Sequence, residues 1–312
     1  MARGLNRVLD WLALLRPLNI LLISVTPLAI WASLVAPLYG DTVLTARQVL
    51  YLGVAIALVA AGGNVVNDIA DRTIDELNGR PNPLLRGVSV AEAWGLYVVT
   101  VLASGALSLK LAQDVGWLAG LALFPAAVGA LLAYAFVLKC KPLAGNLVVA
   151  GLCAAVPAIV LLVETALLAG LPTELNAHVI LAYIGFAFAG TMARETVKDL
   201  EDRDGDRLAG CATLAVRWPE ARTRRLALAW GGLALAAVVY IAVVYFRANV
   251  GGAGVGWSLV AGFLAVGLWN VDVVRDSPRH TYAIVSRQLK YTLALALVVL
   301  VIYGRPSWNL AL

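Results

Sequence analysis

Two groups of acidic and amide side chains recur with one spacing in this chain. The first group consists of Asn64, Asp68, Asp71 and Asp75. The second group consists of Glu195, Asp199, Asp202 and Asp206. In each group the offsets are 0, 4, 7 and 11, which follow one face of an α-helix. The sequence therefore predicts two helices that each present a row of oxygen ligands, called here the first and second acidic rows.

Carboxylates stacked on one helical face repel each other, and a bound cation relieves that repulsion. Hard oxygen ligands suit Mg²⁺, which commonly binds through one or two carboxylates together with the phosphate oxygens of a substrate. Two acidic rows facing each other across a cavity would hold a metal-bound diphosphate between them. The alternative is that both rows are solvated helix ends paired with Arg and Lys. That alternative suits a single row better than a repeated one.

Four basic residues could bind the diphosphate through their positive charge. Two lie in the polar segment 138–143 and two lie beside the second acidic row. They are Lys139, Lys141, Arg194 and Lys198. Such side chains, together with Mg²⁺, neutralise the charge that builds on a diphosphate as it leaves. For Lys141 and Arg194, anchoring at the membrane surface is an equally good explanation.

The composition predicts that these groups act within a membrane protein. Of the 312 residues, 61% are apolar and only 14% are charged, which leaves too little polar surface for a soluble domain. The net charge of +5 is spread along the chain without a nucleic-acid-binding motif, so no nucleic acid partner is expected. Cys140, Cys153 and Cys211 form no CxxC pair. We interpret these cysteines as bystanders, with neither a disulfide framework nor a zinc site.

Nine apolar stretches are long enough to cross the hydrocarbon core as helices, which takes about 20 residues. They cover residues 18–37, 47–66, 93–112, 116–137, 144–168, 177–194, 225–246, 253–271 and 288–304. No Pro-, Gly- or Ser-rich linker divides them. The predicted fold class is all-α: a polytopic membrane protein with one domain over residues 1–312.

Basic residues alternate between the two sides of the predicted spans. Of the 24 Lys and Arg residues, 20 lie in the leader and in or beside the segments 67–92, 138–143, 195–224 and 272–287. The other four, on the opposite side, are Arg47, Lys110, Arg247 and Arg305. Because basic loops stay in the cytoplasm, the N-terminus and both acidic rows are predicted to face the cytoplasm, in a protein integral to the cell membrane.

Sequence motifs around these residues resemble a known family. The run NDIADRTID, residues 67–75, resembles the NDxxDxxxD signature of the UbiA superfamily of intramembrane prenyltransferases. The second acidic row resembles that superfamily's second aspartate-rich motif, with its DxxxD core at Asp202 and Asp206. Two further similar segments are LLRPLN, with Arg16, Pro17 and Asn19, and YAFVLKCKPLAGN, with Tyr134, Lys139 and Asn146. The resemblance extends over nearly the whole chain.

The resemblance implies a bundle of about nine helices around a central cavity open to lipid, in which two Mg²⁺ ions bridge a prenyl diphosphate to the protein. The implied metal ligands are Asn67, Asp68, Asp71, Asp75, Asp202 and Asp206. The implied catalytic side chains are those five aspartates with Lys139 and Lys198. The remaining substrate-binding candidates are Asn64, Asn67, Arg80, Arg86, Tyr134, Lys141, Asn146, Arg194, Glu195 and Asp199.

The segment after the first acidic row departs from the family pattern. The family often has RPxRPLxSG where this chain has RPNPLLRG from Arg80. The segment is one residue short, which leaves the role of the second arginine to Arg86 or to no residue.

The run RETVKDLEDRDGD is more similar to the archaeal-type branch of the superfamily than to the hydroxybenzoate branch. The archaeal branch prenylates geranylgeranylglyceryl phosphate in ether-lipid synthesis, so geranylgeranyl diphosphate is the favoured donor and that lipid the favoured acceptor. An aromatic acceptor of quinone synthesis, 4-hydroxybenzoate or homogentisate, is the alternative.

An ion-coupled transporter is the alternative of another class, since carboxylates often mark ion paths in membranes. Transporters place charges near mid-membrane in broken helices, whereas both acidic rows lie at the ends of predicted spans. The same rule would mark Glu164, near the end of the fifth stretch, as a functional acid. Because Glu164 is far from both rows, we expect it to lie at the interface or to pair helices.

Overall fold

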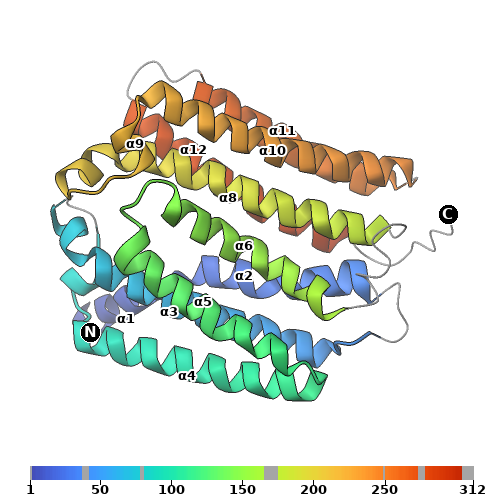
Figure 1. Ribbon diagram of the computed structural model, residues 1–312, viewed down its shortest axis with the longest axis horizontal. Coiled ribbons are helices and arrows are strands. Elements are labelled where there is room, and N and C mark those ends of the chain that lie inside the picture. The colour runs from blue at the N-terminus through green and yellow to red at the C-terminus, as the bar shows by residue number, and fades with distance from the viewer. Residues whose placement is uncertain are drawn as a thin grey trace.

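The computed structural model describes residues 2–36, 42–77, 81–164, 175–248, 250–272 and 278–303, and nine helical segments in these ranges are long and apolar enough to span a membrane. The α-helices are α1 (Ala2–Leu15), α2 (Pro17–Ile30), α3 (Ala46–Leu77), α4 (Val90–Val115), α5 (Leu123–Ala133), α6 (Ala144–Val163), α8 (Leu175–Leu208), α9 (Leu214–Arg217), α10 (Glu220–Arg247), α11 (Gly251–Asp272) and α12 (Pro278–Tyr303). Short 3-10 or π segments are η1 (Trp31–Val35), η2 (Pro83–Leu85), η3 (Leu118–Ala122) and η4 (Tyr134–Leu138). Each predicted stretch corresponds to one spanning segment (Figure 1), which confirms the predicted fold class.

Three of the helices extend further into polar sequence than predicted. Helices α3 and α8 continue to Leu77 and Leu208, and α12 begins at Pro278, so the predicted loops 67–92, 195–224 and 272–287 were drawn too long. Buried Val197 and Leu200 continue the apolar face of α8 between its acidic residues. The packing of α8 therefore continues past the end of its predicted apolar stretch. Because adding residues to an existing helix is favourable, both acidic rows belong to continuous helices.

Arg16 lies at a break between α1 and α2. Pro17 disfavours the right-handed helical conformation at the residue before it, and Arg16 adopts a left-handed conformation with φ 55° and ψ 61°. The break is attached to α3, because the Asn64 side-chain amide donates a hydrogen bond to the Leu15 carbonyl oxygen at 2.9 Å. Arg16 is thereby held against the first acidic row.

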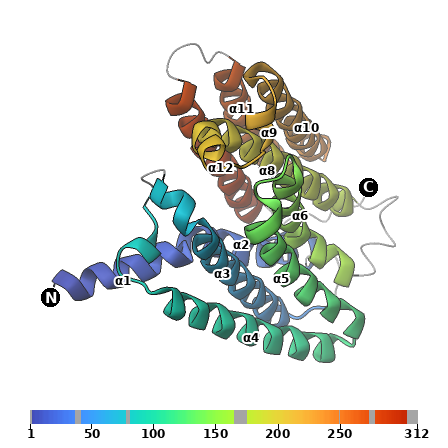
Figure 2. The ribbon, with the colours of Figure 1, turned by 60° about the vertical axis from the view of Figure 1, so that its left-hand side comes forward.

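The main packed core surrounds α8, which lies between α6, α10 and α12 (Figures 1 and 2). Its large buried side chains include Phe186 of α8, Trp257 of α11 and Tyr282 of α12. The outer faces instead expose large apolar side chains such as Leu102 and Trp269. Burial inside and apolar exposure outside are what a bundle needs in lipid, where the surrounding solvent is itself apolar.

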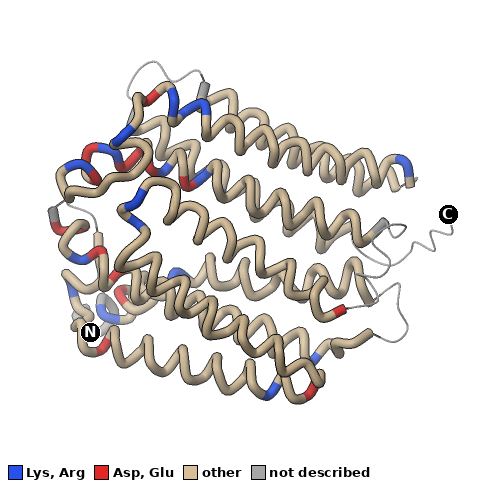
Figure 3. The backbone as a smooth tube through the Cα atoms, viewed as in Figure 1, with Lys and Arg blue, Asp and Glu red and all other residues tan. Residues whose placement is uncertain are grey.

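Charged residues gather at one end of the bundle (Figure 3). The C-terminal ends of α3 and α8 and the segment after η4 all lie at this end, which we call the charged end. The two acidic rows therefore share one end of the bundle.

Glu164 lies at the opposite end, directly after α6, and is 3% exposed. Its carboxylate oxygens accept hydrogen bonds from the backbone N–H groups of Val43 and Leu44, each at 3.0 Å. The side chain therefore joins the end of α6 to the segment before α3. This buried contact gives Glu164 a structural role, in line with the expectation that it pairs helical segments.

Candidate active site

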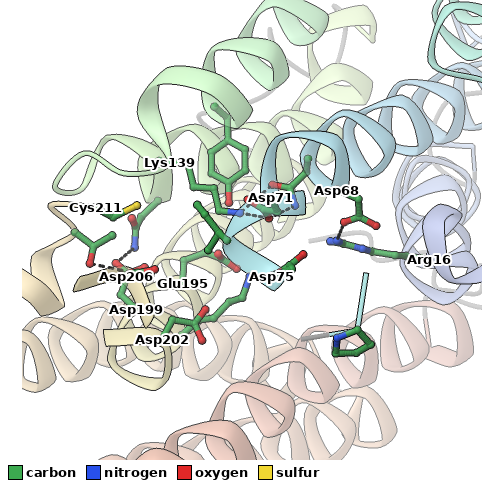
Figure 4. A pocket seen from close by; sticks show the side chains of 18 of the residues that line it. Arg16, Asp68, Asp71, Asp75, Lys139, Glu195, Asp199, Asp202, Asp206 and Cys211 are labelled. Atoms are coloured by element: carbon green, nitrogen blue, oxygen red, sulfur yellow. Dashed lines mark hydrogen bonds and ion pairs between the residues drawn. The ribbon is translucent and has the colours of Figure 1, made fainter. Parts of the chain in front are cut away.

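The two acidic rows line a common polar cavity of about 660 Å³ at the charged end (Figure 4). Seven carboxylates line it: Asp68, Asp71, Asp75, Glu195, Asp199, Asp202 and Asp206. Four basic residues line it: Arg16, Arg86, Lys139 and Lys198. Asn67, Tyr134 and Asn146 also face it. The bundle thus brings together most of the residues that the sequence singled out.

The charge of this polar cavity fits a site for Mg²⁺ and a diphosphate together. With all groups ionised, the seven carboxylates exceed the four basic side chains by three negative charges. An anionic diphosphate would be repelled unless cations enter with it. Among the described residues, no three Asp, Glu, His or Cys side chains converge closely enough to hold an ion by themselves. The donors therefore fit Mg²⁺ that completes its coordination with phosphate oxygens and water.

The first acidic row is held by basic and amide groups from three segments. Arg16 forms an ion pair with Asp68, and Lys139, which follows η4, forms one with Asp71. The Asn67 amide donates to Asp71 Oδ2 at 2.9 Å, and Lys139 Nζ also donates to Asn67 Oδ1 at 3.4 Å. Lys139 thus reaches across from the α5 side of the bundle to α3, although 68 residues separate it from Asp71.

Asn82 contacts the first acidic row, a role that the sequence did not suggest. It is 1% exposed, and its amide donates to the Asp68 carbonyl oxygen and to Asp75 Oδ2, both at 2.9 Å. Its side-chain oxygen accepts from Leu84 N at 2.9 Å. The Asn-Pro dipeptide at residues 82–83 indicates a turn. It does not reveal that this turn folds back onto the first acidic row.

The second acidic row has its own partners. Asn146, near the start of α6, donates to Asp199 Oδ2 at 3.0 Å, and Thr213 donates to Asp206 Oδ2 at 3.1 Å. Arg194 pairs with the neighbouring Glu195. Asn146 and Thr213 each orient one carboxylate of α8 from another segment, whereas Arg194 pairs with Glu195 within α8 itself.

Cys140 and Cys211 form a disulfide, which corrects the expectation that no disulfide is present. Their Cα atoms lie 4.5 Å apart, and Ala212 N donates to the Cys140 carbonyl oxygen at 2.8 Å. The expectation failed because cysteine spacing carries no information about residues 71 positions apart that tertiary packing makes adjacent. The bond joins the segment that carries Lys139 to the segment that follows Asp206.

A second, largely apolar cavity of about 480 Å³ adjoins the polar one. The residues that line both are Arg16, Asn67, Tyr134, Glu195 and Lys198. The apolar cavity also reaches Leu44, Trp117 and Val163, which lie near the helix ends opposite the charged end. It therefore runs along much of a span, which for the 20 residues of α6 is roughly 30 Å.

Four predicted site residues lie elsewhere or differ in surroundings. Arg80 falls outside the described residues, and Lys141 is exposed and outside the set that lines the polar cavity. Arg194 and Asn64 line the apolar cavity. Arg86 does line the polar cavity, which places it where the shortened segment left a role for a second arginine.

Comparison with known proteins shows which family the chain matches. The model of the UbiA prenyltransferase family matches residues 25–285. Digeranylgeranylglyceryl phosphate synthase of Thermococcus kodakarensis is 30% identical over 260 residues, which cover 82% of this chain and 85% of that protein. The enzyme of the same name from Natronomonas pharaonis is 33% identical over 177 residues, 57% of this chain and 59% of that protein. The latter match thus spans less than two thirds of the relative.

Solved structures share the fold. One, described as a study of digeranylgeranylglyceryl phosphate synthase in membranes, superposes with a TM-score of 0.64 at 19% identity, covering 96% of this chain and 99% of that chain. A UbiA homolog from Archaeoglobus fulgidus, bound to DMAPP and Mg²⁺, gives 0.61 at 16% identity, covering 93% and 99%. The chain therefore belongs to the UbiA prenyltransferase family and is an integral membrane enzyme that transfers prenyl groups.

Proposed function

We propose that this enzyme transfers the geranylgeranyl group of geranylgeranyl diphosphate, in the presence of Mg²⁺, to a hydroxyl of geranylgeranylglyceryl phosphate. The observation that carries the proposal is the junction of a polar, carboxylate-rich cavity with a long apolar one. That junction suits a substrate with an anionic head and a lipophilic tail.

In this proposal the diphosphate occupies the polar cavity. Mg²⁺ would be held by Asn67 and the aspartates of the two acidic rows, and when bound it neutralises the charge that develops on the leaving diphosphate. Lys139, which follows η4, and Lys198 of α8 both line the cavity and supply fixed positive charge there. They stabilise the state in which the bond between prenyl C1 and the diphosphate oxygen breaks.

The prenyl tail occupies the apolar cavity, and C1 lies at the junction near Tyr134. Apolar walls exclude water that would otherwise capture the carbocation-like C1. The acceptor hydroxyl oxygen instead bonds to C1 and forms an ether, while its proton passes to a basic oxygen of the polar cavity. The length of the apolar cavity supports a long prenyl chain.

The names of the relatives support the phosphate-bearing lipid acceptor. Proteins named digeranylgeranylglyceryl phosphate synthase are 30% and 33% identical to this chain. The aromatic acceptors of quinone synthesis are the competing choice. The excess of Lys and Arg at the charged end supports a cytoplasmic location for the site and the N-terminus.

The test is an acceptor panel. Purified protein in lipid nanodiscs receives Mg²⁺, radiolabelled geranylgeranyl diphosphate and, separately, geranylgeranylglyceryl phosphate, 4-hydroxybenzoate or homogentisate. We expect prenylation of the glyceryl phosphate. Asp68→Asn and Asp202→Asn should each lower the rate at least 100-fold, a loss typical of removing one group that stabilises transition-state charge.

Asp114→Asn is the matched control. Asp114 lies near the C-terminal end of α4, away from the polar cavity, and pairs with Lys110. This variant should retain the parental rate. Prenylation of an aromatic acceptor instead would overturn the acceptor assignment. Parental donor binding and transfer in both site variants would overturn the site.

A further inference from the structure

A cluster of basic side chains lines the apolar cavity, and two of its three members, Arg194 and Lys290, lie outside the set that lines the polar cavity. Its members come from three elements: Arg16 between α1 and α2, Arg194 of α8 and Lys290 of α12. Lys290 is close enough to Arg194 and Arg16 for their positive charges to repel its own. We call these three residues the basic cluster.

Lys290 is placed deep in its helix. It lies 12 residues after the start of α12 and 13 before its end, which corresponds to roughly 18–20 Å of helix on either side. A charged side chain within a membrane span is costly and ordinarily has a functional reason. The short predicted span 288–304 placed Lys290 near a membrane surface, so the sequence analysis gave it no role.

The partners of the basic cluster are incomplete. Arg16 pairs with Asp68, and a terminal nitrogen of Arg194 pairs with Glu195, but Arg194 Nε is buried without a hydrogen-bond partner. Within the described part of the chain, no carboxylate or other acceptor pairs with Lys290. Lys290 itself is only partly buried, whereas the buried Arg194 Nε without an acceptor carries a desolvation penalty that a bound anion would remove.

The two cavities differ in the sign of their charge. The apolar cavity is lined by four basic residues, Arg16, Arg194, Lys198 and Lys290, and by one carboxylate, Glu195. The polar cavity, by contrast, has more carboxylates than basic residues. An anion can therefore bind beside the basic cluster directly, whereas the polar cavity needs metal cations to accept one.

We propose that Lys290 and Arg194 bind the phosphate head group of the prenyl acceptor without the help of Mg²⁺. This inference rests on the proposed function and adds the position of the second substrate. With its phosphate at the basic cluster, the acceptor presents its hydroxyl to the junction of the cavities, where prenyl C1 lies. A phosphate dianion matches two cations better than a carboxylate does, which favours a phosphorylated lipid over an aromatic acid.

The experiment compares Lys290→Met with the parent on two acceptors, geranylgeranylglyceryl phosphate and its unphosphorylated alcohol, geranylgeranylglycerol. We expect the KM for the phosphorylated acceptor to rise about tenfold or more, as for loss of a charged hydrogen bond. The KM values for the alcohol and for the prenyl diphosphate should stay within twofold. Lys290→Arg should retain most of the affinity.

Arg287→Met is the matched control, because Arg287 lies one turn earlier on α12, is exposed, and donates only to the Ala283 carbonyl oxygen of its own helix. It should behave as the parent. Equal increases in KM for both acceptors, or an unchanged KM for the phosphorylated one, would overturn the inference. If Lys290→Met raised only the KM for 4-hydroxybenzoate, tested as a third acceptor, the assignment of the basic cluster to phosphate would be overturned.

A binding arm separates this inference from the proposed function. If the parent prenylates neither lipid, the proposed acceptor is wrong, and equilibrium binding of geranylgeranylglyceryl phosphate in EDTA then decides the inference. Binding by the parent that weakens about tenfold in Lys290→Met supports the anion site. Absent binding, or equal affinity in the two proteins, refutes it.

Discussion

Asn82→Ala tests whether the turn after α3 positions the first acidic row for the proposed Mg²⁺ site. Asn82 is buried and makes three hydrogen bonds of 2.9 Å, to the Asp68 carbonyl, to the Asp75 carboxylate and from Leu84 N. The two neutral bonds contribute about 1 kcal/mol each and the bond to the carboxylate about 1.5 kcal/mol or more. We therefore expect a loss of about 3–4 kcal/mol in stability.

Part of that loss bears directly on Mg²⁺. Without the Asn82 amide, Asp75 loses the donor that fixes its carboxylate, so the ion must order that side chain when it binds. A penalty of about 1.5 kcal/mol raises the half-saturating Mg²⁺ concentration for prenyl transfer about tenfold. The assay is the transfer rate at saturating prenyl diphosphate over a Mg²⁺ titration, with the melting temperature recorded for each variant.

Asn176→Ala is the control for stability alone. Its amide donates one hydrogen bond, to the Leu34 carbonyl oxygen at 2.9 Å, away from the acidic rows. That variant should lose stability and keep the parental Mg²⁺ titration. The reasoning is refuted if Asn82→Ala titrates within twofold of the parent, or if Asn176→Ala shifts the titration equally.

Three further outcomes follow from the contacts described. Lys139→Met should lower the transfer rate about 100-fold or more, because Lys139 lines the polar cavity. Lys141→Met changes an exposed residue two positions away, and its transfer rate should stay within twofold of the parent. Equal rates in the two variants would contradict the role of Lys139. Glu164→Gln replaces one of two accepting oxygens and should cost about 1–3 kcal/mol in thermal unfolding without altering the Mg²⁺ titration. Peptide mapping without reductant should recover a linked Cys140–Cys211 peptide and one free thiol, and three free thiols would exclude the bond.

The sequence predicted the fold well because its evidence was local. Apolar stretches of about 20 residues record the thickness of the bilayer, and nine such stretches correspond to the nine spanning segments of the described chain. Helix ends were less well predicted, because α8 continues beyond residue 194 on buried Val197 and Leu200. Hydropathy averages do not detect an apolar face that is interrupted by carboxylates.

What the sequence by itself determined is that each acidic row lies on one helical face and that both rows leave the membrane at the same end, since helical periodicity and span parity are properties of the chain alone. Only the tertiary structure decided which side chains meet these rows. Asn82 turns back to Asp75, Cys140 meets Cys211, and Lys290 lines the apolar cavity. Such contacts depend on loop paths and on the rotation of packed helices, and local sequence encodes neither.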